Sequence, residues 1–347
     1  MLFDNIQGQE SAVATLRQAL ASGRLGHAYL FTGPAGVGKK RTALALAQAL
    51  LCDDKPREGC GVCAGCVSVA AGTHPDLFVV APVAGKRDVT IDQVRDLQRL
   101  LGLHAVRGGK KVALLDDAHL LNPAAQSALL KILEEPPGDA LLILCTVNSA
   151  TLSRPLLSRC QQVRFAALPL SVVEDLLVRE HGKDPATAHA LALYSRGSLG
   201  RAVALDPQVF TEERQYAVKE IQYLSGASFT TLTRLAEWLV ADRAKKTPAS
   251  DQPAEGRATG ERLEILLSWY EEVLRYVLVG QEGVVYYQDC LPAVAAAAAG
   301  LDAPEALRQL TLVYDTIQAL RRNANRQLAV EDLLVQLAAP RSLAVTD

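Results

Sequence analysis

A phosphate-binding sequence near the amino terminus constrains the fold of this chain more than any other feature. Residues 33–39, Gly-Pro-Ala-Gly-Val-Gly-Lys, satisfy the pattern Gly-x4-Gly-Lys. The apolar stretch 27–31 before them predicts a strand, and residues 41–51 after them predict a helix. A strand, a glycine-rich loop and a helix in this order surround phosphate oxygens with backbone N–H groups. The residues of this predicted phosphate site are Gly33, Gly36, Gly38 and Lys39.

The position after Lys39 departs from the pattern. A nucleotide-hydrolysing loop has Ser or Thr there, whose hydroxyl binds Mg²⁺, and this chain has Lys40. An ammonium group cannot coordinate a cation, and Thr42 comes two positions too late on the helix to replace the hydroxyl. We therefore expect the loop to be a scaffold, and we do not expect ATP with Mg²⁺ to be a productive cofactor at this site.

Strands and helices alternate through the first half of the chain. Val13, Leu16 and Leu20 lie on one stripe and predict an amphipathic helix at residues 6–22. Apolar strands are predicted near residues 76–81, 111–116, 141–147 and 162–165. Thr90 and Gln93 form a capping box at the start of one intervening helix, and Asn122 followed by Pro123 starts another. This alternation predicts a parallel sheet covered by helices on both faces, with ligands at the carboxyl ends of the strands.

Two carboxylates end the strand near residues 111–116. Asp116 has the position of a Mg²⁺ ligand, and Asp117 stands where many ATPases use Glu to polarise water. Because Asp is one methylene shorter than Glu, its carboxylate reaches less far toward an attacking water. An acidic pair of this kind is also common as a plain solvent-exposed strand end.

A cluster of cysteines predicts a metal site. Cys60, Cys63 and Cys66 have the Cys-x2-Cys spacing, and Cys52 lies just upstream. Four thiolates complete the coordination of a tetrahedral Zn²⁺ and leave no position for water, so the predicted zinc is structural. His74 is the alternative fourth ligand.

An iron–sulfur cluster is the rival interpretation of these cysteines. Its bacterial ferredoxin sequence continues with x3-Cys-Pro, whereas here no cysteine follows until Cys145. We interpret Cys145, Cys160 and Cys290 as buried thiols beside apolar segments.

Length and composition predict several domains. A chain of 347 residues exceeds the about 250–300 at which single cores stop growing. Hydrophobic residues make up 49% and aromatic residues 5%, a balance that favours packed helices, and the pattern is helical after residue 165. The predicted domains are 1–165 with an insert at 52–66, a small helical domain at 166–208 and a helical bundle at 209–347. Residues 245–257 predict a mobile loop within that bundle.

The net charge, the first residues and the apolar runs limit the partners that this chain could have. A formal net charge of −2 gives no global basic field, so strong sequence-independent binding of DNA by the isolated chain is not expected. The first residues lack the pattern of a signal peptide, and no apolar run approaches the about 18 residues of a membrane span. We expect a cytoplasmic protein without a membrane partner.

Several of these sequences occur together in one known family. The segments are residues 33–39, Asp116–His119, Ala128–Pro137, Thr146–Asn148 and Ser158–Cys160. In this order they resemble the bacterial clamp-loader subunits of the AAA+ superfamily, over about residues 1–205. The resemblance implies an α/β AAA+ domain with a zinc-binding insert, a small helical lid and an all-α carboxy-terminal collar. It also favours Cys52 as the fourth zinc ligand.

Two branches of that family compete. The gamma/tau subunits are ATPases that normally carry Ser or Thr after the loop lysine and often a long carboxy-terminal extension. Lys40 and the short chain favour the delta prime branch of the DNA polymerase III clamp loader. That branch implies gamma/tau and delta subunits as partners, and contact with the sliding clamp and primer-template DNA through the complex. An active gamma/tau-like ATPase is the alternative, supported by Lys39, Asp116, Asn148 and Arg201.

The resemblance also implies roles for three polar residues. Asn148 has the sensor 1 position, where it would monitor the γ-phosphate, and Arg201 has the sensor 2 position on the lid. Arg159, in Ser-Arg-Cys, corresponds to an arginine finger that enters the ATP site of a neighbouring subunit. The alternative for Arg159 is a surface arginine paired with a nearby carboxylate.

Overall fold

The chain forms two compact units, Met1–Leu205 and Asp206–Asp347, in a computed structural model. The structure describes residues 2–83, 88–106, 109–221, 224, 227–241, 257–322 and 324–339. The predicted loop at 245–257 falls outside the described residues except for its last position.

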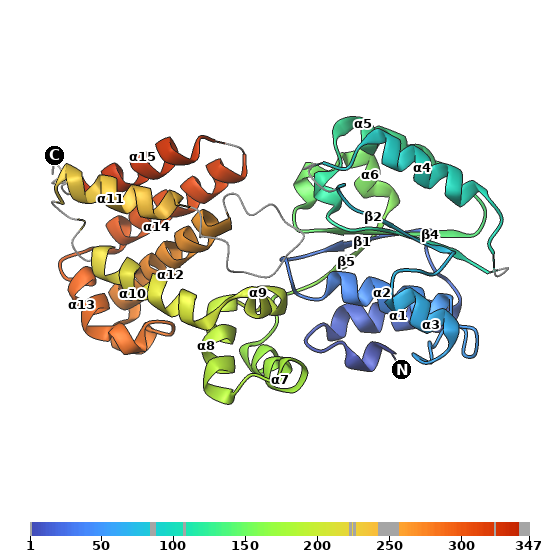
Figure 1. Ribbon diagram of the computed structural model, residues 1–347, viewed down its shortest axis with the longest axis horizontal. Coiled ribbons are helices and arrows are strands. Elements are labelled where there is room, and N and C mark those ends of the chain that lie inside the picture. Colours follow the sequence, from blue (N-terminus) through green and yellow to red (C-terminus); the bar gives the residue numbers. More distant parts are fainter. Residues whose placement is uncertain are drawn as a thin grey trace. The chain divides into compact units, whose positions relative to one another are not determined.

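The first unit is built on a five-stranded parallel sheet (Figure 1). Its strands are β1 (Ala28–Thr32), β2 (Leu77–Val80), β3 (Lys111–Leu115), β4 (Ala140–Thr146) and β5 (Gln161–Arg164). The order across the sheet is β2-β3-β4-β1-β5, and every neighbouring pair is parallel. Every residue of β3 and β4 is buried, as expected for strands covered on both faces. The predicted parallel α/β sheet is confirmed.

Helices cover both faces of the sheet, as Figure 1 shows. One face carries α1 (Glu10–Ser22), α2 (Lys39–Leu50) and α3 (Ala64–Ala70), and the other carries α4 (Ile91–Gly102), α5 (Pro123–Glu134) and α6 (Arg154–Arg159). Because neighbouring strand residues point to opposite faces, Phe31 packs in the cluster with α1 and α2, and Leu30 packs in the cluster with α4 and α5.

The predicted helix starts are present, with one correction. Thr90 and Gln93 form the capping box of α4, and the Asn122 side chain accepts the Ala125 N–H at 2.8 Å at the start of α5. The first helix, predicted from residue 6, begins at Glu10, because Gly8 has a left-handed backbone with φ 72° and Leu2–Asn5 forms a 3-10 turn. Hydrophobic periodicity does not predict α3, because this helix is only seven residues long.

Three short helices complete the first unit. They are α7 (Leu170–His181), α8 (Pro185–Ser195) and α9 (Leu199–Ala204). The start of α9 returns to the phosphate loop, where the Gly200 N–H donates to the Gly36 carbonyl at 3.0 Å. Arg41 on α2 also forms an ion pair with Glu180 on α7 at 2.8 Å.

The described part of the second unit is helical. Its helices are α10 (Pro207–Ile221), α11 (Phe229–Val240), α12 (Arg257–Val279), α13 (Leu291–Ala298), α14 (Ala303–Arg321) and α15 (Arg326–Ala338), with 3-10 turns at Gln281–Gly283 and Gln288–Cys290. Trp269 and Tyr287 meet edge to face in its core, with ring centroids 5.3 Å apart. A buried ion pair between Arg262 and Glu213, at 2.9 Å, joins α12 to α10.

Among the described helices, none alone is long and apolar enough to cross a membrane. One pair, 288–298 with 303–320, has sufficient length and apolar composition when the two segments are taken together, but a bend of 115° separates them.

Candidate functional site

The phosphate loop follows the carboxyl end of β1 and leads into α2, as the motif requires. Lys39 is 8% exposed, and its ammonium group donates to the carbonyl oxygens of Gly33 at 2.8 Å and Pro34 at 2.6 Å. Burial lowers the pKa of Lys39. The lysine is therefore satisfied by the loop's own carbonyl groups in this conformation.

Two of the three loop glycines are required by packing. A Cβ atom on Gly33 would lie 2.2 Å from the Phe165 carbonyl oxygen, just beyond β5. A Cβ atom on Gly36 would lie 2.3 Å from the Ser198 side-chain oxygen and 3.0 Å from the Gly200 nitrogen. Gly38 has no atom within 4 Å, and its φ of 101° alone favours glycine. The loop is thus held between β5 and the start of α9.

Lys40 occupies the region where a metal would be held. Its ammonium nitrogen lies 3.1 Å from Asp116 Oδ2, and the two side chains are 56% and 22% exposed. The buried hydroxyl of Thr42 donates to the Gly38 carbonyl at 2.9 Å, so it is turned into the helix. These residues do not fit Mg²⁺, because one expected ligand is an ammonium group and the other is paired with it.

Asp117 begins the turn after β3 in an unusual conformation. Its φ of 53° is left-handed, and burial, followed by the charge of Asp116, raises the pKa of its carboxyl group. His119 Nδ1 lies 3.9 Å from Asp117 Oδ1, and burial lowers the pKa of this histidine. The fold therefore opposes charge at both positions.

The two predicted sensor residues lie with the loop at the carboxyl end of the strands. Asn148 follows β4, is exposed, and its side chain accepts the Ala150 N–H at 2.9 Å, which stabilises a local turn. Arg201 lies on α9, one residue after the Gly200 that contacts the loop. Their roles as sensors stay predictions.

Arg159 lies at the opposite end of the sheet, where the strands begin. It ends α6 two residues before the start of β5, whose first residue pairs with Tyr29 near the amino end of β1. Its guanidinium group pairs with Glu134 at 2.8 Å and donates to the Pro155 carbonyl at 2.9 Å. Four strand residues span about 13 Å, so this side chain and the chain's own phosphate loop lie at opposite ends of the strands.

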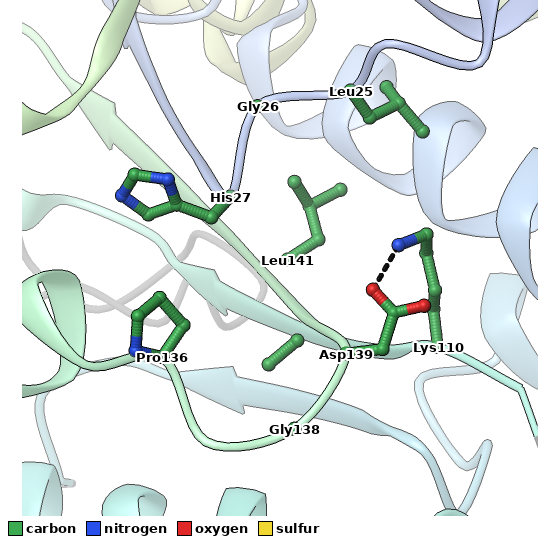
Figure 2. A pocket seen from close by; sticks show the side chains of 9 residues that line it. Leu25, Gly26, His27, Lys110, Pro136, Gly138, Asp139 and Leu141 are labelled. Atoms are coloured by element: carbon green, nitrogen blue, oxygen red, sulfur yellow. Dashed lines mark hydrogen bonds and ion pairs between the residues drawn. The ribbon is translucent and has the colours of Figure 1, made fainter.

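A cavity of about 320 Å³ also lies at this amino edge, where β1, β3 and β4 begin (Figure 2). Figure 2 shows His27, Leu141 and Pro136 around it, and Lys110 paired with Asp139. Ligands of open α/β sheets bind at the carboxyl ends of the strands, so the cavity is separate from the nucleotide-type site. No sequence pattern indicated it, because its lining comes from turns that meet only in the folded sheet.

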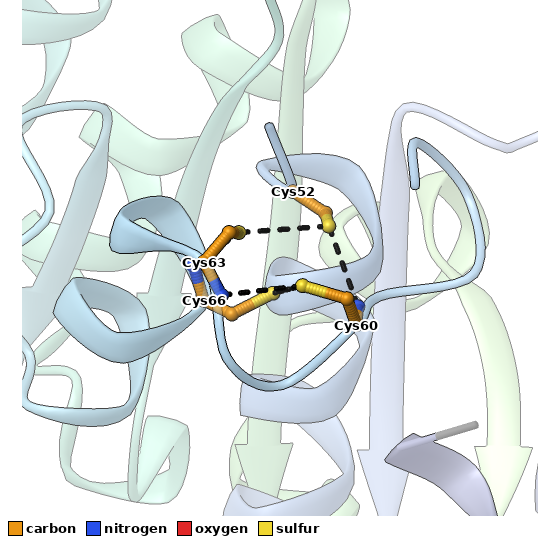
Figure 3. Close-up of side chains that lie close together, drawn as sticks. All are labelled: Cys52, Cys60, Cys63 and Cys66. Carbon is orange, nitrogen blue, oxygen red and sulfur yellow. Dashed lines mark hydrogen bonds between the residues drawn. The ribbon is translucent and has the colours of Figure 1, made fainter. Parts of the chain in front are cut away.

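The four predicted cysteine ligands come together in a single cluster (Figure 3). Their sulfur atoms all lie within 4.8 Å of one another, with Cys52 and Cys63 3.7 Å apart and Cys60 and Cys66 4.0 Å apart. Thiolates on one tetrahedral Zn²⁺, with Zn–S near 2.3 Å, are about 3.8 Å apart. The cluster could therefore hold a metal ion.

Backbone groups support the cysteine cluster. The N–H groups of Cys60 and Cys66 donate to the sulfurs of Cys52 and Cys63, each at 3.3 Å. The second of these bonds also caps α3, which starts one residue after Cys63. His74, the alternative fourth ligand, is not part of this cluster. Its Nδ1 accepts a hydrogen bond from the Asp76 N–H at 3.0 Å.

The sheet order, the loop after β1, the acidic pair after β3 and the small helices that contact the loop define the first unit as a P-loop α/β domain. Residues 8–169 match the family described as "DNA polymerase III, delta subunit".

Known relatives narrow the class. Over 200 residues the chain is 40% identical to the DNA polymerase III subunit delta' of Pseudomonas aeruginosa, a match that covers 57% of this chain and 61% of that protein. It is 28% identical to the Bacillus subtilis subunit delta' over 333 residues, or 95% and 96% of the two chains. It is also 33% identical to the Escherichia coli subunit tau over 231 residues, which covers 65% of this chain and 36% of that protein. The chain is thus similar in sequence to the delta' subunits of bacterial DNA polymerase III.

Proposed function

We propose that this chain is a delta prime-type subunit of a DNA polymerase III clamp loader, and that it works in DNA replication by assembly and not by its own hydrolysis of ATP. Its partners are then gamma/tau and delta subunits, with the sliding clamp and primer-template DNA reached through the complex. The observation that carries this proposal is the ion pair between Lys40 and Asp116, because the residue that replaces the Mg²⁺-binding hydroxyl also pairs with the carboxylate that would hold the metal during phosphoryl transfer.

Arg159 is the residue proposed to act on a neighbouring subunit. Its place at the amino edge of the sheet supports action in trans, because the chain's own loop lies at the carboxyl edge. The side chains of Arg159 and Glu134 are 36% and 51% exposed, and an exposed pair of this kind contributes about 0.2–1 kcal/mol. Exchange of Glu134 for a triphosphate would therefore cost little.

The cysteine cluster is proposed to hold structural Zn²⁺. Four thiolates at tetrahedral spacing leave no ligand position open, so this metal would stabilise the insert and would not activate water. Gln48 on α2 donates to the Cys66 carbonyl at 2.9 Å, which ties the insert to the sheet domain.

The second unit is proposed to form the collar that joins the subunits. Exposed apolar side chains recur at a spacing of seven residues on two of its contacting helices, which is the spacing of one helix face. They are Leu307 and Tyr314 on α14, and Leu328 and Val335 on α15.

The test is steady-state ATP hydrolysis by the full chain, alone and mixed with gamma/tau and delta subunits. We expect no turnover by the chain alone. In the mixture, Arg159→Ala should slow hydrolysis at the site it faces by about 10³-fold, the lower end of the effect of an arginine finger. Arg154→Ala is the matched control, because Arg154 is an exposed arginine on the same helix.

Two outcomes would overturn the proposal. Robust turnover by the isolated chain would move it to the gamma/tau-like motor class. Equal activity of the Arg159→Ala and Arg154→Ala complexes would show that Arg159 is an ordinary surface arginine.

A further inference from the structure

We infer that Lys40 takes the place of Mg²⁺ at the phosphate loop, and that the loop binds a nucleoside polyphosphate in its metal-free form. This inference rests on the proposed absence of hydrolysis at the loop. It goes further by naming a ligand, and by predicting that the metal opposes its binding.

The two ammonium groups of the loop have separate partners. Lys39 and Lys40 are the first two residues of α2, so their side chains leave the helix about 100° apart. Lys39 turns back to the carbonyl groups of Gly33 and Pro34, while Lys40 reaches Asp116, which follows β3. One lysine thus lies in the loop, and the other lies between the loop and the carboxylate.

The ligands that Mg²⁺ would take are engaged. A nucleotide-bound Mg²⁺ is held by one or two protein oxygens, phosphate oxygens and water, and it gives up water reluctantly. Here the hydroxyl is replaced by Lys40, and the Asp116 carboxylate, which is 22% exposed, already has that ammonium 3.1 Å away. A metal ion would have to displace a covalently tethered cation, whose effective concentration is high.

The loop nevertheless keeps the features that bind phosphate. Gly36 and Gly38 have left-handed backbones, which turn successive N–H groups toward one concave side, and the loop leads directly into the amino end of α2. The contact with α9 uses the carbonyl oxygen of Gly36 as acceptor, so it consumes none of the loop's N–H groups. Lys39 can exchange its bonds to neutral carbonyls for stronger bonds to phosphate oxygens.

The charges at the loop explain why Mg²⁺ should weaken nucleotide binding there, and why the site does more than bind nucleotide without it. Mg²⁺ brings two positive charges, and Lys40 brings one that is fixed in the chain. With Lys40 beside Asp116, an added Mg²⁺ meets a like charge at short range. Mg²⁺ in solution also complexes the polyphosphate and so removes the form that the two lysines can bind.

The experiment is an equilibrium titration of the isolated full chain with a fluorescent ADP analogue, first in a chelator and then in Mg²⁺. We expect wild-type protein to bind in the chelator and to bind about threefold or more weakly in Mg²⁺. Lys40→Thr restores the hydroxyl and frees Asp116, so Mg²⁺ should strengthen its binding by about tenfold. Lys131→Thr, which changes an exposed lysine on α5, should match the wild type.

A second variant keeps the test decisive if Lys40→Thr fails to fold. Asp116→Asn removes a negative charge and releases Lys40, so it should strengthen metal-free binding, whereas in a metal-dependent site it would abolish binding. Lys39→Ala should lose most binding in either condition.

Three results would overturn the inference: stronger binding by wild type in Mg²⁺, no binding by wild type in the chelator at millimolar analogue, or weaker metal-free binding by Asp116→Asn. Because no partner subunit is present, these results are separate from the proposed assembly role. Failure of the proposed assembly role would be seen only in the ATP hydrolysis measured with gamma/tau and delta subunits, and not in this titration.

Discussion

Replacing Gly36 with Ala adds a methyl group where the phosphate loop meets α9. The left-handed backbone, with φ 69°, costs an L-residue about 1–2 kcal/mol. The new Cβ would lie 2.3 Å from the Ser198 side-chain oxygen, which accepts the Arg201 N–H at 3.2 Å, and loss of such a cap costs about 1 kcal/mol. The Gly200 nitrogen, at 3.0 Å from the new Cβ, would also move, and its hydrogen bond to Gly36 contributes about 1 kcal/mol.

These costs are partly offset in the unfolded chain. Alanine restricts the unfolded backbone and returns about 0.4–1 kcal/mol, so the expected loss of unfolding free energy is about 2–3.5 kcal/mol. With a urea dependence of about 2 kcal/mol per molar, the middle of the usual range, the midpoint of the first unit should fall by roughly 1–2 M.

The assay is urea unfolding of the full chain followed by two signals. Both tryptophans of the sequence, Trp238 and Trp269, lie in the second unit, so tryptophan fluorescence follows that unit. Far-UV circular dichroism follows both units. The circular dichroism transition should move to lower urea in Gly36→Ala, while the fluorescence transition should stay in place.

Two controls separate packing from backbone strain. Gly38→Ala, at φ 101° with no neighbouring atom within 4 Å, carries only the backbone cost. Ser198→Gly removes the clashing oxygen at a cap cost of a few tenths of a kcal/mol, so it should recover about 0.5 kcal/mol or more of the Gly36→Ala loss. Two results would refute the contact between the loop and α9. One is that the losses of unfolding free energy in Gly36→Ala and Ser198→Gly add strictly in the double variant, and the other is a loss under about 0.5 kcal/mol in Gly36→Ala alone.

Three further predictions follow from other contacts. Cys66→Ser should lower bound zinc from about one ion per chain, measured by elemental analysis of purified protein, and an unchanged zinc content would contradict the cluster. Arg262→Met removes the guanidinium group that pairs with Glu213, whose side chain is 10% exposed. The unfolding free energy measured by tryptophan fluorescence should then fall by about 3–5 kcal/mol, and a fall below about 1 kcal/mol would be inconsistent with a buried pair. Asp117→Asn should raise the unfolding free energy at pH 7. Burial holds the pKa of Asp117 above 3.8, so the wild-type penalty grows as pH rises through the folded pKa and is absent below pH 3.8. Asparagine also tolerates the left-handed backbone, and a gain of equal size at acid and neutral pH would argue against this cause.

Local patterns were sufficient for the elements that position the site. The apolar runs of β3 and β4, the capping box at Thr90 and the Asn122–Pro123 start are short-range signals, and the structure contains each of them. The start of α1 was predicted four residues too early, because hydrophobic periodicity does not register the left-handed turn at Gly8. Helix α3 was missed because it is seven residues long and starts within the cysteine sequence.

The sequence by itself determined which groups are available: a phosphate loop with ammonium in place of hydroxyl, a pair of carboxylates after a strand, and cysteines at ligand spacing. Only the tertiary structure decided which of them meet. Lys40 reaches Asp116 because β4 alone separates β1 from β3, so the carboxyl ends of both strands come to the same edge. Arg159 is placed at the other edge because β5 runs parallel to β1, and a residue before a parallel strand cannot lie with the residues after its neighbour. Strand order is set by burial of the whole sheet between its two helical layers, a long-range balance that no local pattern contains.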